Sequence, residues 1–365
     1  MPFFTSWLPK KQVCLSSLSL IILGTGFFLP GISSCSHLHQ PHGAGEQPDT
    51  QSLEAGLKKH VYHLAGTIGE RNAYLPGTME KSCSYLEKEW KDMGYGVNRH
   101  PVALGTERSF DKAAGQTVYN LEVLKPGSKQ SAPVLVIGAH YDTRVGMPDW
   151  NKHGPVLAAK TGTPGANDNA SGIAALLELS RALKNIPTQR PILFVAYANE
   201  EAPFFQTSSM GSLVHARSLK ERKTPVLGMI SLETLGCYSP RENKKRSSAV
   251  AAGLAGLPDR CDYVAFLSTN TGKNFSREAA GKFTANCRFP IRSAVFPYYT
   301  KGVAWSDDWA YMKQGIPSFA VTDTAFLRCD DYHETSDTPE KLDYHSFAEV
   351  TNGLIHMVQK LANEE

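Results

Sequence analysis

The sequence predicts an α/β fold with a mixed, mainly parallel, twisted sheet that is flanked by helices on both faces. Residues 134–139 and 192–198 form near-continuous apolar runs rich in β-branched and aromatic side chains, which is typical of strands buried on both faces. A helical run over residues 173–183 lies between them. Residues 226–232 and 316–321 are further apolar runs. Like the first two runs, each is followed by polar residues. This order of strands and helices favours a parallel sheet.

The N-terminal part adds elements at one edge of this sheet. Helical apolar spacing predicts helices over residues 53–65 and 77–93, and Gly94-Tyr95-Gly96 ends the second one. Residues 97–104 and 117–124 have the pattern of strands. We expect these two strands to extend the sheet at one edge in the antiparallel sense.

The C-terminal half contains two clear helices, over residues 211–220 and 344–361. The segment 237–303 is the least regular part of the chain. It contains a possible strand at residues 263–267 and a helix over residues 276–287. We expect this segment to form an excursion near the crevice of a single catalytic domain, residues 52–365.

The first residues have the pattern of an export signal. Lys10 and Lys11 precede an apolar stretch that ends in Ile32-Ser33-Ser34-Cys35. A basic start, an apolar middle and small residues before a cleavage point are typical of a secretory signal. The ending resembles a bacterial lipobox, so we expect residues 1–34 to be a lipoprotein signal peptide and Cys35 to carry the lipid. The alternatives are an ordinary signal cut nearby or a retained membrane anchor.

This interpretation predicts an exported protein that is lipid-anchored at Cys35 in a bacterial cell envelope. Residues 35–51 are polar and contain Gly and Pro, which is typical of a tether between membrane and domain. The three histidines of this tether could bind metal, but we favour a solvated linker as their explanation. The formal net charge is +3 over 365 residues, so the charge does not favour a nucleic-acid partner.

Besides Cys14 and Cys35, the chain has five cysteines: Cys83, Cys237, Cys261, Cys287 and Cys329. One or two disulfides are possible in an oxidising compartment, but their connectivity does not follow from the sequence. No two cysteines are spaced C-x-x-C, so we expect no cysteine metal site.

Imidazole and carboxylate groups follow the predicted strands at the points where the strands end. In open α/β sheets, ligands bind outside the carboxyl ends of the strands, so these side chains should converge on one crevice. Two histidines with several carboxylates, and no thiolate, suit zinc or a similar divalent ion. They are numerous enough for two ions that share a bridging carboxylate. The residues are His140, Asp142, Asp168, Glu200, Glu201, Glu233 and His333.

Spacing assigns roles to some of these residues. Residues i and i+2 of an extended chain point the same way, so Asp142 can orient the His140 imidazole toward a metal. Glu200 and Glu201 diverge at a strand end, so one can bind metal while the other faces the water that the metal activates. Two adjacent carboxylates at a buried strand end cost free energy unless a cation compensates.

Each of the remaining residues has a simpler interpretation when it is considered alone. Asp168 can cap the helix that follows it, and Glu233 and His333 can be surface residues. Considered together, the segments favour ligands, with Asp168 as the bridging carboxylate. Asp307 and Asp308 precede a short helical segment, and we expect them to support the site or contact substrate, with helix capping as an equal alternative.

At these residues the chain resembles the co-catalytic di-zinc aminopeptidases, in the metallopeptidase group that also includes glutamate carboxypeptidase and glutaminyl cyclase. The matching stretches are GAHYDT, GANDNASG, ANEE, SLETLG and YHETSDT, in family order within residues 52–360. The resemblance implies two zinc ions per chain. It implies His140 and Glu233 as the outer ligands of one ion, Glu201 and His333 as those of the other, and Asp168 as the bridge.

The resemblance further implies that Glu200 is the general base and that Asp142 is the partner of His140. Glu233 stands where the family often has Asp, which lengthens the ligand arm by one methylene. Several relatives have His at the position of Asp308. The implied activity is hydrolysis of N-terminal peptide bonds, with peptides as substrates. The alternatives are a carboxypeptidase-like or glutaminyl-cyclase-like activity, or a non-catalytic binding protein on the same fold.

Overall fold

The computed structural model describes residues 49–106, 113–145, 162–242, 257 and 260–364. The chain divides into two units, Met1–Gly43 and Ala44–Glu365, and all described residues belong to the second. The expected signal peptide, Cys35 and most of the tether therefore lie outside the described residues. Within the described ranges, no helix has the length and apolar character needed to cross a membrane.

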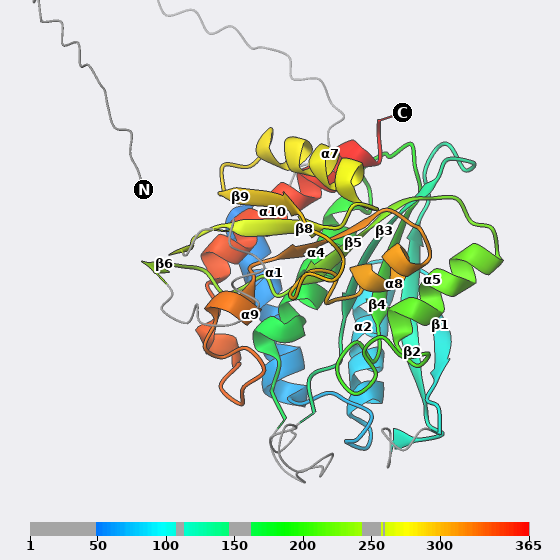
Figure 1. Cartoon of the computed structure of the whole chain (residues 1–365), viewed down its shortest axis with the longest axis vertical. Helices are drawn as coiled ribbons and strands as arrows, with labels where there is room; N and C mark the ends of the chain where they lie inside the picture. Colours follow the sequence, from blue (N-terminus) through cyan, green and yellow to red (C-terminus); the bar gives the residue numbers. More distant parts are fainter. Residues whose placement is uncertain (1–48, 107–112, 146–161, 243–256, 258–259, 365) are drawn as a thin grey trace, which may run out of the picture. The chain divides into compact units, whose positions relative to one another are not determined.

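An eight-stranded sheet runs through the second unit in the order β1-β2-β4-β3-β5-β10-β8-β9 (Figure 1). β3 pairs in parallel with β4 and β5, β5 pairs in parallel with β10, and β8 with β9. The other three pairings are antiparallel. The strands are β1 (Val97–Ala103), β2 (Thr117–Lys125), β3 (Val134–His140), β4 (Ile192–Tyr197), β5 (Val226–Glu233), β8 (Val264–Ser268), β9 (Ile291–Val295) and β10 (Ser318–Thr322). The predicted mixed, mainly parallel sheet is confirmed, and so is its antiparallel edge at β1 and β2.

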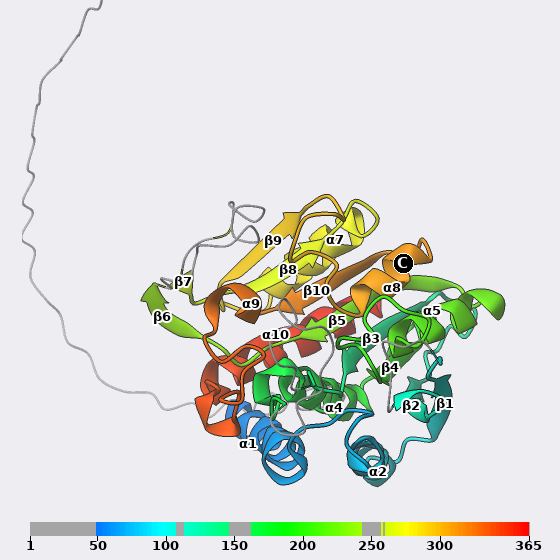
Figure 2. The ribbon, with the colours of Figure 1, turned by 60° about the horizontal axis from the view of Figure 1, so that its bottom comes forward.

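Helices cover both faces of this sheet (Figure 2). One face carries α1 (Thr50–Val61), α2 (Thr78–Asp92), α4 (Gly172–Leu183), α7 (Lys273–Thr284) and α10 (Tyr344–Leu361). The other face carries α5 (Gly211–Glu221) and α8 (Asp308–Lys313). Shorter elements complete the description: η1 (Tyr62–Ile68), η3 (Ala166–Ser171), β6 (Ser239–Glu242), β7 (Arg260–Cys261), α9 (Ala325–Arg328) and η4 (Pro339–Lys341).

Alternation along β3 explains why the strand is apolar over its whole length. Leu135 and Ile137 pack into the core beneath α4, whereas Val134 and Val136 pack into the core beneath α5. Each fully buried side chain of this size stabilises the fold by about 1.5–3 kcal/mol. α4 itself lies between the sheet and the α1–α10 layer, so nearly all its residues are buried.

Residues 237–303, which we expected to form an excursion near the crevice, contribute to the main sheet. Their strands β8 and β9 extend the sheet beyond β10, and α7 packs against α10. α7 begins three residues before the predicted helix, at Lys273. β8 is a buried run of only five residues, and β9 is a half-exposed edge strand. Such short strands have weak periodicity, which is why the sequence indicated little of this part.

Candidate metal centre

The register of the parallel strands brings the predicted ligands to one edge of the sheet. Gly138 of β3 pairs with Ser231 of β5, so His140 and Glu233 both follow two residues later. Glu233 in turn pairs with Thr322 of β10. Because parallel strands end in the same direction, the side chains that close these strands meet in one crevice.

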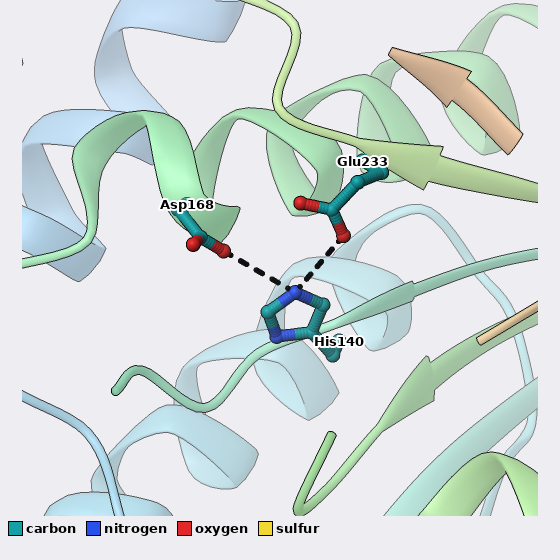
Figure 3. Close-up of side chains that lie close together, drawn as sticks. All are labelled: His140, Asp168 and Glu233. Carbon is teal, nitrogen blue, oxygen red and sulfur yellow. Dashed lines mark hydrogen bonds and ion pairs between the residues drawn. The ribbon is translucent and has the colours of Figure 1, made fainter. Parts of the chain in front are cut away.

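Two clusters of ligand atoms lie in this crevice. In the first, His140 Nε2 lies 3.4 Å from Asp168 Oδ1 and 3.2 Å from Glu233 Oε2 (Figure 3). In the second, His333 Nε2 lies 3.0 Å from Asp168 Oδ2 and 3.3 Å from Glu201 Oε1. Within each cluster the ligand atoms are no more than 4.8 Å apart. Asp168 belongs to both clusters, with one carboxylate oxygen directed to each imidazole.

The chemistry of these donors fits a divalent metal. His140, Asp168 and Glu201 are at most 6% exposed. Glu201 Oε1 has no hydrogen bond of regular geometry from any described residue. A buried carboxylate of this kind is costly unless a cation compensates it. Nitrogen and oxygen donors without thiolate suit zinc, so the residues present fit this metal.

The charges in the crevice attract positive charge. Burial alone would raise the pKa of Asp168, but its hydrogen bonds with His140 and His333 lower it instead. Burial disfavours the charged form of His333, yet Glu201 and Asp168 raise its pKa to about 10. The pKa of His140 is likewise raised against the effect of burial, by Glu200 and the neighbouring carboxylates. At both imidazoles, the neighbouring carboxylates therefore raise the pKa by more than burial lowers it.

Asp142 holds the end of β4 in place. Its Oδ1 accepts a hydrogen bond from the Glu200 backbone N–H and its Oδ2 accepts one from that of Glu201, each at 3.0 Å. Its Oδ1 also lies 3.5 Å from His140 Nδ1, while its own backbone oxygen is nearer to that nitrogen, at 3.2 Å. The sequence predicted the pairing with His140 but missed the contacts to the two glutamates.

Glu200 lies beside the clusters rather than in either of them. Its carboxylate is 3.8 Å from His140 Nε2 and lines the pocket at the site. Burial raises its pKa well above the ordinary value, and Glu201 and Glu233 add to this effect while His140 opposes it. A carboxylate with this position and environment is suited to accept a proton beside a metal.

Two further residues hold the loops that carry the ligands. Asp337 accepts hydrogen bonds from the backbone N–H groups of Asn167 and Asp168, at 2.8 and 3.0 Å. Arg71, with no solvent exposure, donates to the carbonyl oxygens of Tyr141 and Gly165, both at 2.9 Å. Asp337 lies in the YHETSDT stretch, so the family resemblance indicated that this part of the chain belongs to the site. No pattern in the sequence indicated Arg71.

Asp307 and Asp308 are not in contact with the pocket. Both are at most 1% exposed, and neither is among the described residues that line the pocket. The expectation that they contact substrate is therefore wrong. Asp307 occupies the N-cap position of α8, but its side chain makes no capping hydrogen bond. Burial raises the pKa of Asp307 to about 7 and that of Asp308 to about 8.

An open pocket of about 560 Å³ leads to the clusters. Arg144 lies in its wall, and one of its guanidinium nitrogens is 2.5 Å from His333 Nδ1. Trp305 at the rim is 45% exposed. Aromatic side chains form much of the remaining wall, and they are Phe205, Phe326 and Tyr332. The pocket thus combines an acidic floor, apolar walls and one guanidinium group.

Comparison with known proteins agrees with this geometry. The family model described as peptidase family M28 matches residues 120–358. The uncharacterised protein YfbL of Escherichia coli is 32% identical over 302 residues, which are 83% of this chain and 86% of YfbL.

Solved structures share the fold at lower identity. BSAP, a zinc aminopeptidase from Bacillus subtilis, has a TM-score of 0.60 at 15% identity, and the match covers 85% of this chain and 95% of BSAP. A glutaminyl cyclase from Fimbriiglobus ruber has a TM-score of 0.58 at 21% identity, with 88% and 99% covered. The family match includes His140, Asp168, Glu200, Glu201, Glu233 and His333, the residues that meet at the sheet edge. The chain therefore belongs to peptidase family M28 and is a metal-dependent peptidase.

Proposed function

We propose that this chain is an aminopeptidase that binds two zinc ions and hydrolyses N-terminal peptide bonds. The observation that carries the proposal is the position of Asp168, whose two carboxylate oxygens are directed to the imidazoles of two separate clusters. A carboxylate shared in this way suits a site for two ions. His140 and Glu233 would complete one ion's protein ligands, and Glu201 and His333 those of the other.

Each side chain has a distinct task in this proposal. Two bound zinc ions supply Lewis-acid polarisation and acidify water at neutral pH. His140 and His333 would hold the ions through Nε2, which requires the neutral imidazole. Glu200 accepts the proton of the attacking water and returns it to the leaving amine. Ser306, which donates a hydrogen bond to Glu233 Oε2 at 2.8 Å, holds that carboxylate in position.

The pocket supports a substrate with a free amino terminus. Of the four carboxylates in its lining, Glu200 is the one that belongs to neither ligand cluster, so its charge stays available to an α-ammonium group when the ions are bound. Its aromatic walls suit an apolar side chain next to that group. Together these features favour short apolar N-termini over blocked ones.

The test replaces Glu200 with glutamine, which keeps the shape of the side chain but removes the base. We expect Glu200→Gln to bind zinc like the original protein and to lose about 10²–10⁴-fold in kcat on aminoacyl p-nitroanilides. Glu334→Gln, an exposed glutamate beside His333, is the matched control and should keep full activity. Normal turnover by Glu200→Gln would remove Glu200 from the mechanism.

One observation favours a second candidate, a carboxypeptidase-like activity. Arg144 places a guanidinium group in the pocket wall, where it can pair with a substrate carboxylate. The two activities separate on capped peptides, because N-acetylation blocks an aminopeptidase and C-terminal amidation blocks a carboxypeptidase. If Arg144 binds a substrate carboxylate, N-acetylated peptides with a free carboxyl end should be cleaved, and Arg144→Ala should raise their KM at least tenfold. Under the aminopeptidase proposal, amidated peptides are cleaved and N-acetylated ones are not.

Cyclase and binding functions are separated from hydrolysis by their products and their metal content. A glutaminyl-cyclase-like activity would release ammonia from peptides that begin with glutamine, without cleaving a peptide bond. A non-catalytic binding protein would bind far less than two equivalents of zinc and would hydrolyse none of the panel. Zinc quantification, an ammonia assay on peptides that begin with glutamine and a panel of aminoacyl substrates together separate these functions from hydrolysis.

We further propose that Cys35 is lipidated and that the protein is anchored in the cell envelope. The proposal is supported by the basic, apolar and small-residue order of residues 1–35. Labelled fatty acid should be incorporated into the full chain and not into Cys35→Ala. Equal labelling of both would contradict the assignment.

A further inference from the structure

Three cysteines gather around the two chain segments that lead to ligands of different clusters. Cys237 follows Glu233 by four residues, and Cys329 precedes His333 by four residues. Cys261, at the end of β7, has its Sγ 3.9 Å from the backbone oxygen of Arg328. Cys261 is 4% exposed, while Cys237 and Cys329 are half-buried.

The thiols of Cys237 and Cys329 are in side-chain contact. A hydrogen bond between them raises the pKa of Cys237 above its ordinary value, and burial adds to this effect. Asp323 fixes both segments beside each other. Its Oδ2 accepts a hydrogen bond from the Cys237 backbone N–H at 2.7 Å, and its backbone oxygen accepts one from the Arg328 guanidinium. The backbone of Cys237 is therefore bonded to Asp323, which precedes Cys329 by six residues, and the Arg328 guanidinium folds back onto the same residue.

We propose that Cys237 and Cys329 form a disulfide that joins the segment after Glu233 to the segment before His333. Nothing in the metal centre uses these thiols, so this inference is independent of the aminopeptidase proposal. With oxidised glutathione as the oxidant, the thiolate of one cysteine attacks the glutathione disulfide and releases one glutathione. The second cysteine attacks the mixed disulfide and releases another. Two protein thiols thus give up two electrons and two protons to one glutathione disulfide.

The bond would have two consequences. It closes a loop of about 90 residues, and a loop of that size strongly restricts the unfolded chain. For a domain of this size, we expect the oxidised protein to melt at a temperature on the order of 5–10 °C higher than the reduced protein. It also joins the chain segment that carries Glu233 to the segment that carries His333. Zinc should therefore dissociate more slowly from the oxidised form.

Peptide mapping tests the pairing directly because trypsin separates the three cysteines. Cys237 lies in the peptide 224–241, Cys261 in 261–273 and Cys329 in 329–341. After the folded full chain is incubated with oxidised glutathione and free thiols are blocked, we expect peptides 224–241 and 329–341 to be linked and 261–273 to be unlinked. Reduction should separate the pair. Two unlinked peptides, or a link to 261–273, would overturn the proposal.

Variants provide a second measurement. Cys329→Ser should abolish the linked species and the difference in melting temperature between oxidised and reduced samples, whereas Cys261→Ser should keep both. If Cys329→Ser folds poorly, Cys237→Ser tests the same bond from its other end. A difference in melting temperature that persists in both variants would contradict the pairing.

Discussion

Replacing Asp142 with asparagine tests whether one carboxylate organises the metal centre. In the structure, its two oxygens accept hydrogen bonds from two consecutive backbone N–H groups, those of Glu200 and Glu201. Asparagine has nearly the same shape but only one acceptor oxygen. Its NH2 group would therefore face a backbone N–H, and one of these buried N–H groups would lose its partner.

The magnitude follows from these contacts. A hydrogen bond to a charged group contributes about 1.5–3 kcal/mol, and an unsatisfied buried N–H costs about 1–3 kcal/mol. Both values partly describe the loss of the same hydrogen bond, so they are not simply added. We expect Asp142→Asn to lower the free energy of unfolding by about 2–4 kcal/mol. Asp142 also lies beside His140, and the loss of a group that orients a metal ligand typically weakens metal binding 10–100-fold.

Two assays check this prediction. Urea unfolding of the metal-free protein measures the stability term, and competition with a chelator measures zinc affinity. Asp92→Asn is the matched control, because Asp92 has a side chain 59% exposed and pairs with Lys88 on the surface of α2. It should change the free energy of unfolding by less than about 0.5 kcal/mol. If Asp142→Asn binds zinc and unfolds like the control, the carboxylate does not organise the site.

The remaining predictions concern metal and pH. Removal of metal with a chelator should abolish hydrolysis and lower the unfolding midpoint, because the carboxylates then repel one another without compensation, and added zinc should restore both. Burial lowers the pKa of His215, which lies between Glu122 and Tyr311, so below pH 6.5 the unfolded chain binds more protons than the folded one. The contribution of His215 to stability should therefore decrease as the pH drops from 7.5 to 5.5. In urea unfolding, the difference in the free energy of unfolding between the original protein and His215→Gln should shrink as the pH drops across that range. A constant difference would contradict this prediction.

The sequence predicted the parts of the site that are set by local pattern. Glu200, Glu201 and Glu233 end apolar strands, and a strand that is apolar over its whole length has to be buried on both faces. The direction of parallel strands then brings their ends together without further information. For this reason, the edge of the sheet and the positions of these three glutamates follow from strand pattern and direction, whereas the ligand roles came from the family resemblance.

The groups that hold the ligands were not predictable in this way. Arg71 lies in an irregular segment after η1, and its importance comes from carbonyl oxygens that are distant in the sequence. Asp307 and Asp308 show the opposite error. Two adjacent acids before a short helix resemble a site in the sequence, but packing buries both of them, and neither is among the described residues that line the pocket. Side-chain direction at a helix start depends on such packing, which the local pattern does not specify.

Asp168 shows how the structure decides between two interpretations that the sequence left open. An acid before a helix can cap the helix or bind a cation. A carboxylate oxygen that caps the helix is less available to a cation. Here the neighbouring Asn169 binds the backbone instead. Its Oδ1 accepts hydrogen bonds from the backbone N–H groups of Gly172 and Thr234, at 3.0 and 3.1 Å. Asp168 makes no capping hydrogen bond, so its two oxygens stay directed at His140 and His333. A neutral amide thus satisfies the backbone, and the full charge of the Asp168 carboxylate remains available to bind metal.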